Sequence, residues 1–578
     1  MPTSYYIGVD VGTGSVRAGL VKQDGTLVAS NTVSTITYRD QEDANIFEQS
    51  TNNIWEGMCK AIRTCLAEAK VKRSDVKGVG FDATCSLAVT DMNGDPVVVT
   101  KSDQLGDNGD RNIILWADHR AEEEANLINS TGSVVLDYVG GTMSLEMEIP
   151  KTLWLKKHMS PDKFARCQFF DLPDFLTYRA TGDNTRSCCS LTCKCSFVPT
   201  KNGWQAEFFQ KIGLGEFVEN DFVQIGKKER EVLTAGLPVG KGLSKKAAAE
   251  LGLVEGTPVG SGVIDAYAGW LGTVAARFKE DGKLSDVPNL DESRHRLAAC
   301  AGTSTCHIVQ SPEGIFVNGV WGPYKNAVFP GWWMNEGGQS STGQLIDFMI
   351  TTHPAYPRLK QIAEEQKTNI HEVLQNELNK LCEENGVETW TELTKDMHFY
   401  PDLHGNRSPI ADPRMRGMLM GLALDDGLGD LARKFNLTLE AIALQTRHIV
   451  DEMNAKGHAI TAIYMSGGQA KNLMLMRLFA NTCSMPVVLP QSSGAAVVLG
   501  AAMLGRFAAE AGKRERMTEK EQCEALWNIM IEMTPPGTMI APSASAREKK
   551  LLLAKYKIFR ESIDIQKRWR KEMEDASR

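Results

Sequence analysis

Small residues follow an aspartate at the end of an apolar stretch near the start of the chain. In IGVDVGTGSVRA, residues 7–18, Asp10 precedes the turn Gly12-Thr13-Gly14-Ser15, and the residues after the turn continue as strand. Such a turn lets backbone N–H groups approach phosphate oxygens, and the strand-end carboxylate can hold a hydrated metal ion. A Rossmann or Walker loop would lead into a helix instead. The pattern predicts a nucleotide-phosphate hairpin, with an ordinary hairpin as the alternative.

A second stretch repeats this theme much later in the chain. In AACAGTSTCHIV, residues 298–309, small apolar residues lead to Gly302-Thr303-Ser304-Thr305 and then to another strand. Two such hairpins in one chain indicate a duplicated domain that holds ATP between its halves. This organisation is similar to that of the actin-like ATPases. We therefore expect an α/β fold of two ribonuclease H-like domains with a cleft between them.

Two further motifs carry groups suited to phosphoryl transfer. In GSGVIDAYAG, residues 260–269, Asp265 ends a strand among small residues. A carboxylate exposed there can accept the proton of a sugar hydroxyl, although helix capping is the alternative role. In YMSGGQAKN, residues 464–472, Gly467 and Gly468 allow the backbone to lie against a flat heterocycle. An ordinary strand-to-helix connection is the alternative there.

The elements that must position these groups alternate between strand and helix. Apolar periodicity predicts strands near 5–11, 16–23, 77–82, 86–91 and 257–264, and helices near 50–69, 118–130, 149–157, 341–352, 358–380, 438–456, 471–482 and 494–510. A polar segment before the second half reads as a linker or surface excursion. We expect an N-terminal domain at 1–271, this linker at 272–296, and a C-terminal domain at 297–578 that ends in a helical extension.

Composition limits the class of protein and its partners. The chain has 578 residues, 42% of them hydrophobic and 24% charged, with a formal net charge of −8. This length requires more than one hydrophobic core. The negative net charge gives no indication of binding to nucleic acid or to an acidic membrane surface. The sequence shows no secretory signal, and its longest apolar run, 495–504, falls short of the roughly 18 residues of a membrane span. We expect a cytoplasmic protein.

The cysteines point to the same compartment. There are 13 of them, an odd number scattered along the chain, which does not resemble a disulfide framework. Cys188, Cys189, Cys193 and Cys195 cluster in RSCCSLTCKCSF, but they lack the paired spacing of zinc sites. We expect buried thiols on a strand or loop there rather than a metal centre.

Nine motifs in order resemble the FGGY family of carbohydrate kinases, and within it the pentulose kinases. They are IGVDVGTGSVRA, FDATCS, LWADHR, GSGVIDAYAG, CAGTST, NEGGQSSTG, HGNRSP, MSGGQAKN and VVLGAA, and they run from residue 7 to about 505. The resemblance implies transfer of the γ-phosphate of ATP, with Mg²⁺, to a hydroxyl of ribulose. D-ribulose is the first expectation, with L-ribulose, ribitol and D-xylulose as alternatives.

The resemblance also implies roles for individual residues. Asp265 would be the general base, and Asp10 and Asp265 would lie at the metal ion. The nucleotide would contact Asp10, Gly12, Thr13, Gly14, Ser15, Arg17, Gly302, Thr303, Ser304, Gly467, Gly468, Gln469 and Asn472. The sugar would contact Asp82, Thr84, Cys85, Ser86, Lys194, Asp265, Glu336 and Gln339. For Arg17 a solvated strand face is the alternative, and for Lys194 a buried structural ion pair.

One departure from the family pattern and two rival functions remain. Many members carry a glutamate near the start of the late Gly-Ala-Ala helix, whereas residues 492–502 here contain no acid. A sugar- or nucleotide-sensing scaffold would bind without turnover, and an actin- or chaperone-like ATPase would hydrolyse ATP without sugar. The expected partners are a small-molecule sugar and MgATP, without nucleic acid or membrane, and a homodimer is left open.

Overall fold

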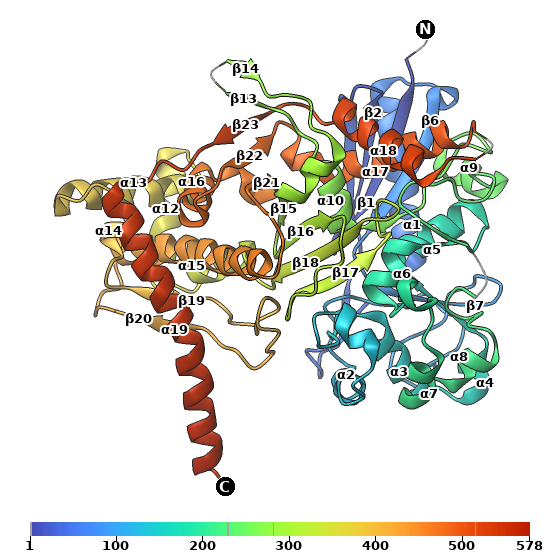
Figure 1. Cartoon of the computed structure of the whole chain (residues 1–578), viewed down its shortest axis with the longest axis horizontal. Helices are drawn as coiled ribbons and strands as arrows, with labels where there is room; N and C mark the ends of the chain where they lie inside the picture. Colours follow the sequence, from blue (N-terminus) through green and yellow to red (C-terminus); the bar gives the residue numbers. More distant parts are fainter. Residues whose placement is uncertain (1–2, 228–230, 281, 515) are drawn as a thin grey trace. The chain divides into compact units, whose positions relative to one another are not determined.

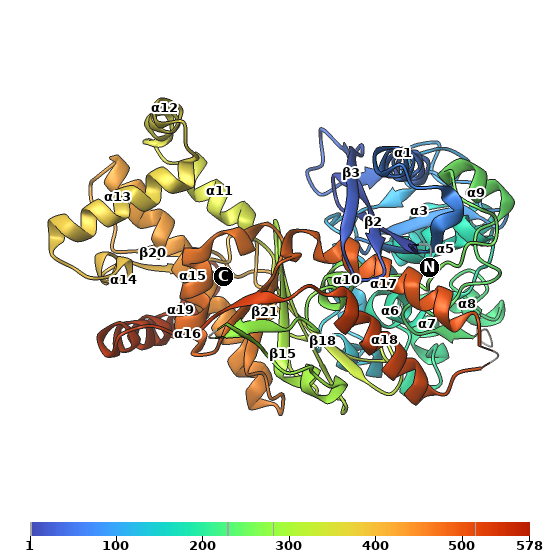
Figure 2. The ribbon, with the colours of Figure 1, turned by 90° about the horizontal axis from the view of Figure 1, so that it is seen from above.

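The computed structural model describes residues 3–227, 231–280, 282–514 and 516–578, and the chain is traced in Figures 1 and 2. It divides into two compact units, each assembled from three stretches. Unit 1 holds 1–298, 308–336 and 490–537, and unit 2 holds 299–307, 337–489 and 538–578. The expected linker at 272–296 includes residue 281, which lies outside the described residues. The boundaries at 1–271, 272–296 and 297–578 stay a prediction about sequence domains.

Unit 1 contains a five-stranded sheet in the order β12-β6-β1-β2-β3. Its strands are β12 (Val263–Ile264), β6 (Val76–Ala83), β1 (Tyr5–Val11), β2 (Ser15–Lys22) and β3 (Leu27–Ser34). β1 and β2 pair antiparallel with Asp10 opposite Arg17, while β1 and β6 pair parallel with Asp10 opposite Asp82. The predicted hairpin, with a strand and not a helix after its turn, is therefore confirmed. The strand predicted at 257–264 is shorter, because only its last two residues pair.

Helix α17 (Ala496–Ala511) covers one face of this sheet at very close range. A Cβ added to Gly80 would lie 1.9 Å from the carbonyl oxygen of Ala501, and one added to Gly8 would lie 2.0 Å from that of Val498. Glycines in two strands thus let the helix backbone approach the sheet directly. The segment 490–537 belongs to unit 1 for this reason, although it is distant in sequence.

The same helix corrects the expectation about membrane spans. Ser493–Ala511 is long and apolar enough to cross a bilayer by length and composition, and 78% of its window is buried inside the protein. Small residues packed against β1 and β6 account for its apolar character.

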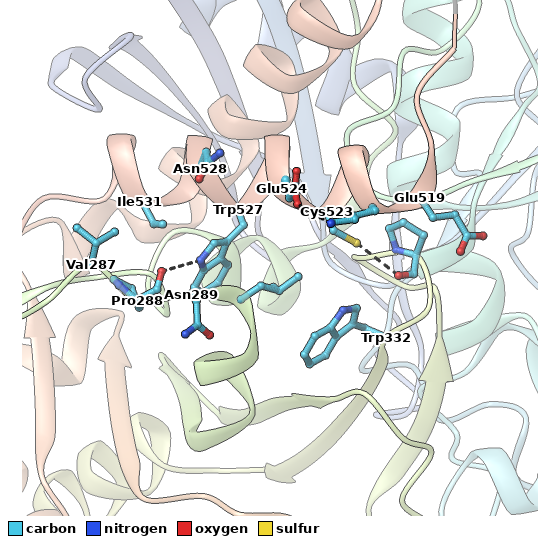
Figure 3. A pocket seen from close by; sticks show the side chains of 13 residues that line it. Val287, Pro288, Asn289, Trp332, Glu519, Cys523, Glu524, Trp527, Asn528 and Ile531 are labelled. Atoms are coloured by element: carbon cyan, nitrogen blue, oxygen red, sulfur yellow. Dashed lines mark hydrogen bonds and ion pairs between the residues drawn. The ribbon is translucent and has the colours of Figure 1, made fainter.

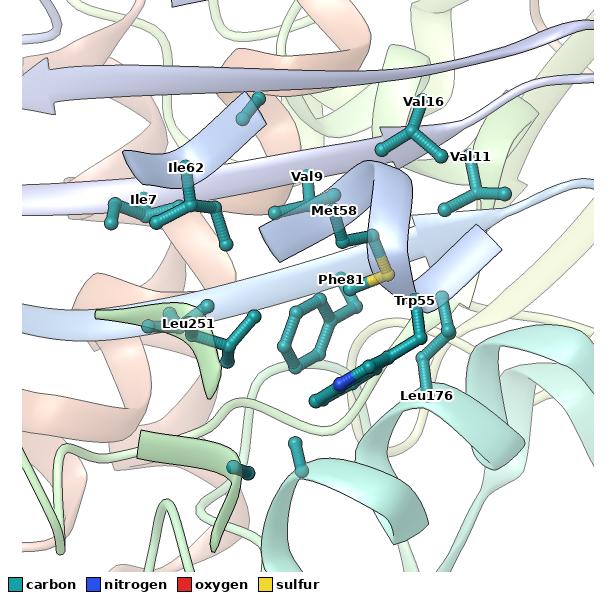
Figure 4. Close-up of a cluster of buried hydrophobic side chains, with 14 of the residues drawn as sticks. Ile7, Val9, Val11, Val16, Trp55, Met58, Ile62, Phe81, Leu176 and Leu251 are labelled. Atoms are coloured by element: carbon teal, nitrogen blue, oxygen red, sulfur yellow. The ribbon is translucent and has the colours of Figure 1, made fainter. Parts of the chain in front are cut away.

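The opposite face of the sheet carries an apolar core (Figure 4). Ile7, Val9 and Phe81 from the strands meet Trp55 of α1 (Thr51–Ala69) and Leu176 of α5 (Leu172–Thr181), and all are at least 98% buried. The alternation of apolar residues in the strands and the helical spacing in α1 produce this cluster. The core holds the first hairpin on a rigid sheet.

A second five-stranded sheet in unit 1 has the order β4-β5-β8-β7-β9. The strands are β4 (Tyr38–Arg39), β5 (Phe47–Gln49), β8 (Ile113–Ile114), β7 (Leu87–Asp91) and β9 (Cys167–Asp171). β10 (Arg186–Ser187) and β11 (Val232–Leu233) form a two-stranded sheet. β13 (Phe278–Glu280) pairs with β14 (Lys283–Leu284), and β17 (Trp321–Lys325) pairs with β18 (Trp333–Gln339), as parts of a larger sheet. The other helices are α2 (Glu122–Asn129), α3 (Glu148–His158), α4 (Pro161–Ala165), α6 (Cys188–Lys194), α7 (Ala206–Ile212), α8 (Gly215–Glu219), α9 (Lys245–Leu251), α10 (Asp265–Leu271) and α18 (Glu519–Met533).

The strands β22 (Val487–Pro490), β21 (Ala462–Ser466), β15 (Arg296–Ala301) and β16 (Thr305–Ser311) are neighbours in that order. Of β15 and β16, unit 2 holds the part within residues 299–307. β19 (His398–Tyr400) and β20 (Met418–Met420) form a separate antiparallel pair, and β23 (Gly537–Ile540) leads into the last helix. The helices are α11 (Gly343–Thr351), α12 (Tyr356–Gln366), α13 (Ile370–Asn385), α14 (Trp390–Leu393), α15 (Leu428–Ala455), α16 (Leu473–Cys483) and α19 (Ala546–Ala576).

The single helix predicted at 358–380 is wrong, because two helices occupy this region. Lys367 ends α12 in the left-handed conformation, and the Asn369 side chain caps the start of α13 by accepting the Glu372 N–H. A left-handed residue followed by an N-cap interrupts a helix even when its apolar spacing continues.

Candidate active site

Three aspartates of unit 1 meet at the ends of neighbouring strands. Asp10 on β1 is the Cα partner of Asp82 on β6, and Val263 of β12 pairs with Asp82 on its other side. Asp265 follows β12 directly and begins α10. Asp82 is fully buried, whereas Asp10 and Asp265 are partly exposed. The register of three strands therefore brings together carboxyl groups that lie far apart in sequence.

Burial raises the pKa of all three carboxyl groups, and neighbouring carboxylates raise those of Asp82 and Asp265 further. Burial, and then the charges of Asp10 and Asp265, raise the pKa of Asp82 well above its usual range. In the described residues, no N–H or hydroxyl group donates to either carboxyl oxygen of Asp82. The pKa of Asp10 is about 6 and that of Asp265 about 7, with burial as the largest cause in both. Burial and the neighbouring carboxylates therefore favour the protonated form of Asp82, and the pKa of Asp265 lies close to neutral pH.

Asp265 has one carboxyl oxygen free to take up a proton. Its Oδ1 accepts the Ala266 N–H at 2.7 Å, which leaves Oδ2 as the acceptor. The charge of Glu336 raises its pKa and the charge of Lys194 lowers it, after the larger effects of burial and Asp10. Asp265 thus has the geometry and the titration range of a general base at neutral pH.

The turn of the first hairpin is open on one side. A Cβ added to Gly14 would meet nothing within 4 Å, and one added to Gly12 would meet only the Ser15 carbonyl oxygen at 3.6 Å. Neither glycine has a positive φ, so internal packing and backbone strain do not explain their presence. The backbone of this turn is therefore open to approach by a ligand.

Thr13 is held by groups that sequence reasoning did not assign to this turn. Its hydroxyl oxygen accepts the indole N–H of Trp116 at 3.0 Å, and its carbonyl oxygen accepts the Gln49 amide at 2.7 Å. Trp116 belongs to the LWADHR motif. Asp118 and Arg120 of that motif belong to a buried ion pair at 2.7 Å.

Arg17 makes structural contacts at both ends of its guanidinium. It donates to the Ser30 hydroxyl at 3.0 Å and to the Gly494 carbonyl oxygen at 2.7 Å. Neither a solvated strand face nor a phosphate contact describes these bonds, which link β2 to the start of α17. Its role at the nucleotide stays a prediction.

The predicted sugar residues of unit 1 lie in one buried region. The Thr84 and Ser86 hydroxyls are 3.3 Å apart, and the Ser86 oxygen accepts the Trp116 backbone N–H at 3.2 Å. Burial raises the pKa of the Cys85 thiol, which the charge of Lys194 opposes. Lys194, 1% exposed, lies over the Trp321 ring at 4.1 Å. Glu336, 2% exposed, pairs in register with Trp321.

Two further carboxyl groups near Lys194 were missed by sequence reasoning. Burial and then the charge of Asp171 raise the pKa of Glu148 well above its usual range, and burial raises that of Asp171 to about 7. The charge of Lys194 opposes both shifts. No local signal marks these residues, because Glu148 begins an ordinary helix and Asp171 caps α5. Only tertiary packing brings them to Lys194.

Unit 2 gathers the residues predicted for the nucleotide. The Gln469 amide donates to the Gly302 carbonyl oxygen and to the Thr342 hydroxyl, both at 2.7 Å. The Thr303 carbonyl oxygen accepts the Thr342 N–H at 2.9 Å. Ser304 closes the turn, since its carbonyl oxygen accepts the Gly302 N–H at 2.8 Å. The second hairpin and the Gly-Gly turn are therefore one structural assembly.

The two glycines of that turn differ in their surroundings. Gly467 has φ of 89°, and an added Cβ would lie 2.2 Å from the Ala301 carbonyl oxygen, so folding alone requires glycine there. Gly468 and Gly302 have no neighbour within 4 Å of an added Cβ. Asn472 caps α16 by accepting the Leu475 N–H at 3.1 Å. The open face at Gly468 and Gly302 is the part that a ligand can approach.

Gln339 is committed to the protein interior of unit 2. Its amide nitrogen donates to the Ile442 carbonyl oxygen at 2.9 Å and to the Thr446 hydroxyl at 3.2 Å, both on α15. A role for Gln339 at the sugar stays a prediction, and these bonds give it a separate structural role.

The cysteine cluster forms part of a helix rather than a strand or loop. Ser187 caps α6 by accepting the Cys189 N–H at 3.2 Å, and Cys188, Cys189 and Cys193 are all buried. Burial raises the pKa of Cys188 and Cys189. Among the described residues, no three or more His, Cys, Asp or Glu side chains form a group that could hold a metal ion.

A separate pocket of about 700 Å³ lies in unit 1, and none of the predicted site residues lines it (Figure 3). Trp332 and Trp527 form part of its wall, and the Trp527 indole N–H donates to the Pro288 carbonyl oxygen at 2.9 Å. This pocket is therefore separate from the residues predicted for the chemistry.

Comparison with known families gives two adjacent matches. The model of the N-terminal domain of the FGGY family of carbohydrate kinases matches residues 5–272, and the model of its C-terminal domain matches residues 297–509. Together they span most of the chain, and residues beyond 509 lie outside both.

Individual proteins give the same result. The chain is 46% identical over 533 residues to a D-ribulokinase of Saccharomyces cerevisiae, covering 90% of this chain and 74% of the relative. It is 41% identical to a human FGGY carbohydrate kinase domain-containing protein, covering 99% and 98%. A solved xylulose kinase from Rhodospirillum rubrum superposes with a TM-score of 0.73 at 18% identity, covering 98% of this chain and 99% of that one. This last likeness shows the fold, and the α/β prediction is confirmed.

Proposed function

The chain belongs to the FGGY family of carbohydrate kinases, and from this premise we propose that it transfers the γ-phosphate of ATP to a hydroxyl of D-ribulose. The class, a phosphotransferase that acts on sugars, follows from the family. The choice of D-ribulose is supported by the 46% identity to a D-ribulokinase over most of the chain. L-ribulose, ribitol and D-xylulose are the alternatives that an experiment must separate.

The observation that carries the proposal is the setting of Asp265. Its Oδ2 accepts the proton of the attacking sugar hydroxyl, because Oδ1 is held by the Ala266 N–H at 2.7 Å. A pKa of about 7 makes proton uptake favourable without keeping the group protonated at neutral pH. Lys194 and Glu336 border the same carboxyl group and offer a donor and an acceptor to sugar hydroxyls.

Asp10 and Asp265 have side chains of the kind that bind Mg²⁺. Asp10 and Asp265 supply carboxylate oxygens, which are the ligands that Mg²⁺ takes in small number beside phosphates and water. Burial raises the pKa of both groups, and the charge of Asp10 raises that of Asp265 further; a divalent cation would favour the ionised form of each. Bound Mg²⁺ would supply neutralisation of phosphate charge. The open backbone at Gly14 and Gly302 is where phosphate oxygens would be bound by N–H groups.

Release of ADP from MgATP tests the proposal directly. The assay uses D-ribulose, L-ribulose, D-xylulose, ribitol and glycerol, with Asp265→Asn as the test variant and Asp162→Asn, an exposed aspartate of α4, as the matched control. We expect turnover with D-ribulose, a loss of roughly 10²–10⁴ in Asp265→Asn, and no change in the control. A folded Asp265→Asn protein with unchanged turnover would refute the role of Asp265.

Two other outcomes would change the proposed function. ATP hydrolysis without any sugar would indicate a conformational ATPase. Binding of nucleotide and sugar without turnover would indicate a sensing scaffold. Turnover confined to another sugar of the panel would keep the kinase and change its substrate.

A further inference from the structure

The loop between β19 and β20, residues 401–417, lies against the second hairpin through one arginine. A Cβ added to Gly338 would come within 2.5 Å of the Arg407 Nε, so the guanidinium lies directly on that glycine. Arg407 Nη1 donates to the Cys306 Sγ at 3.7 Å. After burial, its charge is the second cause that lowers the pKa of His307, to about 3. Arg407 thus supports the strand that follows the turn Gly302–Ser304.

The start of this loop is fixed by a buried hydrogen-bond network. The Asn406 amide donates to Asp402 Oδ2 at 2.7 Å, and Gln445 of α15 donates to Asp402 Oδ1 at 2.6 Å. The Asn406 backbone N–H donates to the Asp412 carbonyl oxygen at 2.9 Å. Asn406, the neighbour of Arg407, is therefore held both to α15 and to the far side of the loop at Asp412.

The far side of the loop is held by one stripe of α19. Gln566, Arg570 and Glu574 recur every four residues and so share a helix face. Gln566 Oε1 accepts the Arg416 N–H at 3.2 Å, Arg570 donates to Asp412 Oδ2 at 2.6 Å, and Arg414 donates to Glu574 Oε1 at 2.7 Å. All three contacts fall within five consecutive loop residues, 412–416.

Buried contacts anchor the earlier turns of α19 to the same unit. Lys555 forms an ion pair with Glu440 of α15, and both side chains are at most 3% exposed. Met415 of the loop packs in one apolar cluster with Phe559 and Ile563 of α19. Figure 1 shows α19 running past β19 and β20 toward the C-terminus. The helix lies wholly beyond residue 509, where the family model ends, whereas the loop lies within that model.

We propose that α19 is a positioning element for the nucleotide site. Through Arg570 the helix fixes the conformation of the β19–β20 loop, and the loop in turn holds Arg407 against the second hairpin. The inference rests on the proposed function in taking Gly302–Ser304 as a phosphate-binding turn. Arg570 touches no part of that turn, so its action passes through Asp412, the loop and Arg407. A chain reduced to the two family domains would lack this support.

Arg570→Ala in the full-length protein tests the kinetic consequence. The control is Arg568→Ala, since Arg568 lies on the same helix, is 66% exposed and pairs only weakly with Glu572 at 3.8 Å. We expect Arg570→Ala to raise the KM for MgATP roughly two- to tenfold with the KM for D-ribulose unchanged. Asp412→Ala should do the same, the double variant should add little, and Arg570→Lys should recover part of the loss.

Equal kinetics for Arg570→Ala and Arg568→Ala would overturn the proposal. So would an equal rise of both KM values together with a lowered melting temperature, because that result indicates general destabilisation. Additive effects of Arg570→Ala and Asp412→Ala would show that Arg570 does not act through Asp412. This result would overturn the proposed coupling from α19 to the loop.

Hydrogen exchange gives a readout that does not depend on catalysis. In Arg570→Ala we expect faster amide exchange in residues 402–416 and also in residues 300–306, with no change in Arg568→Ala. Faster exchange in the loop alone would overturn the coupling to the hairpin. Faster exchange in both segments would support it even if no sugar stimulated ATP turnover, so failure of the proposed function remains distinguishable.

Discussion

The titration of Asp265 makes the sharpest prediction about catalysis. With a pKa of about 7, about a tenth of the carboxyl groups are ionised at pH 6 and about nine tenths at pH 8. A general base must be ionised to accept a proton. We therefore expect kcat/KM to be about tenfold lower at pH 6 than at pH 8, because this ratio reports the free enzyme. An aspartate with the ordinary value of 3.8 would give a flat profile over this range.

Two substitutions identify the group that titrates. Glu336 raises the pKa of Asp265 and Lys194 lowers it. Glu336→Gln should therefore move the acid limb of kcat/KM to lower pH, and Lys194→Met should move it to higher pH, whatever each does to the maximal rate. For Asp10 and Asp171, whose pKa values also lie near neutrality, burial is the largest cause of the shift.

Initial rates of ADP release at low sugar and low MgATP, taken in half-unit steps from pH 5.5 to 9, supply the profile. The melting temperature at each pH separates titration from unfolding. A flat wild-type profile would refute the raised pKa of Asp265. An acid limb that Glu336→Gln leaves in place would assign it to another carboxyl group.

Three further predictions concern stability. Gly80→Ala should destabilise unit 1 by about 1–3 kcal/mol, since the new Cβ would lie 1.9 Å from the Ala501 carbonyl oxygen; an unchanged melting temperature would contradict the close approach of α17. Lys555→Met should cost about 3–5 kcal/mol in urea unfolding by leaving Glu440 buried and unpaired, and Glu440→Leu in the same chain should recover most of it. Asp82 has a raised pKa in the folded state, so its contribution to stability is present at low pH and is lost as pH rises. Asp82→Asn should therefore gain in melting temperature over wild type between pH 5 and pH 8, and an equal difference at both pH values would contradict a protonated Asp82.

Local chemistry made much of this protein predictable. The hairpin around Gly12 and Gly14 was predicted because small residues between two apolar stretches form a turn wherever the chain places them. A strand that ends at Asp265 was predicted for the same reason, although helix α10, which begins at this residue, was not. Helical spacing predicted α1, α17 and α19, although it missed the break at Lys367, because left-handed caps do not disturb apolar periodicity.

The state of the site depended on neighbours far away in sequence. Burial raises the pKa of Asp82, and so do Asp10 and Asp265, between which strand register places it; no property of FDATCS reports this. Glu148 and Asp171 reach Lys194 through packing of separate elements, and Gln339 is bound to α15. A pKa depends on every charge and on the burial around a group, so it cannot be read from adjacent residues.

The sequence by itself determined the family and the kind of reaction, and it supplied the predicted substrate contacts, since these follow from motifs of fewer than a dozen residues. The tertiary structure decided which of those residues are free to act, and it joined α19 to a loop about 150 residues earlier in the chain. The physical reason is that a turn or a helix is stabilised by contacts between near neighbours, whereas proton affinity and the support of a loop arise from groups that only folding brings together.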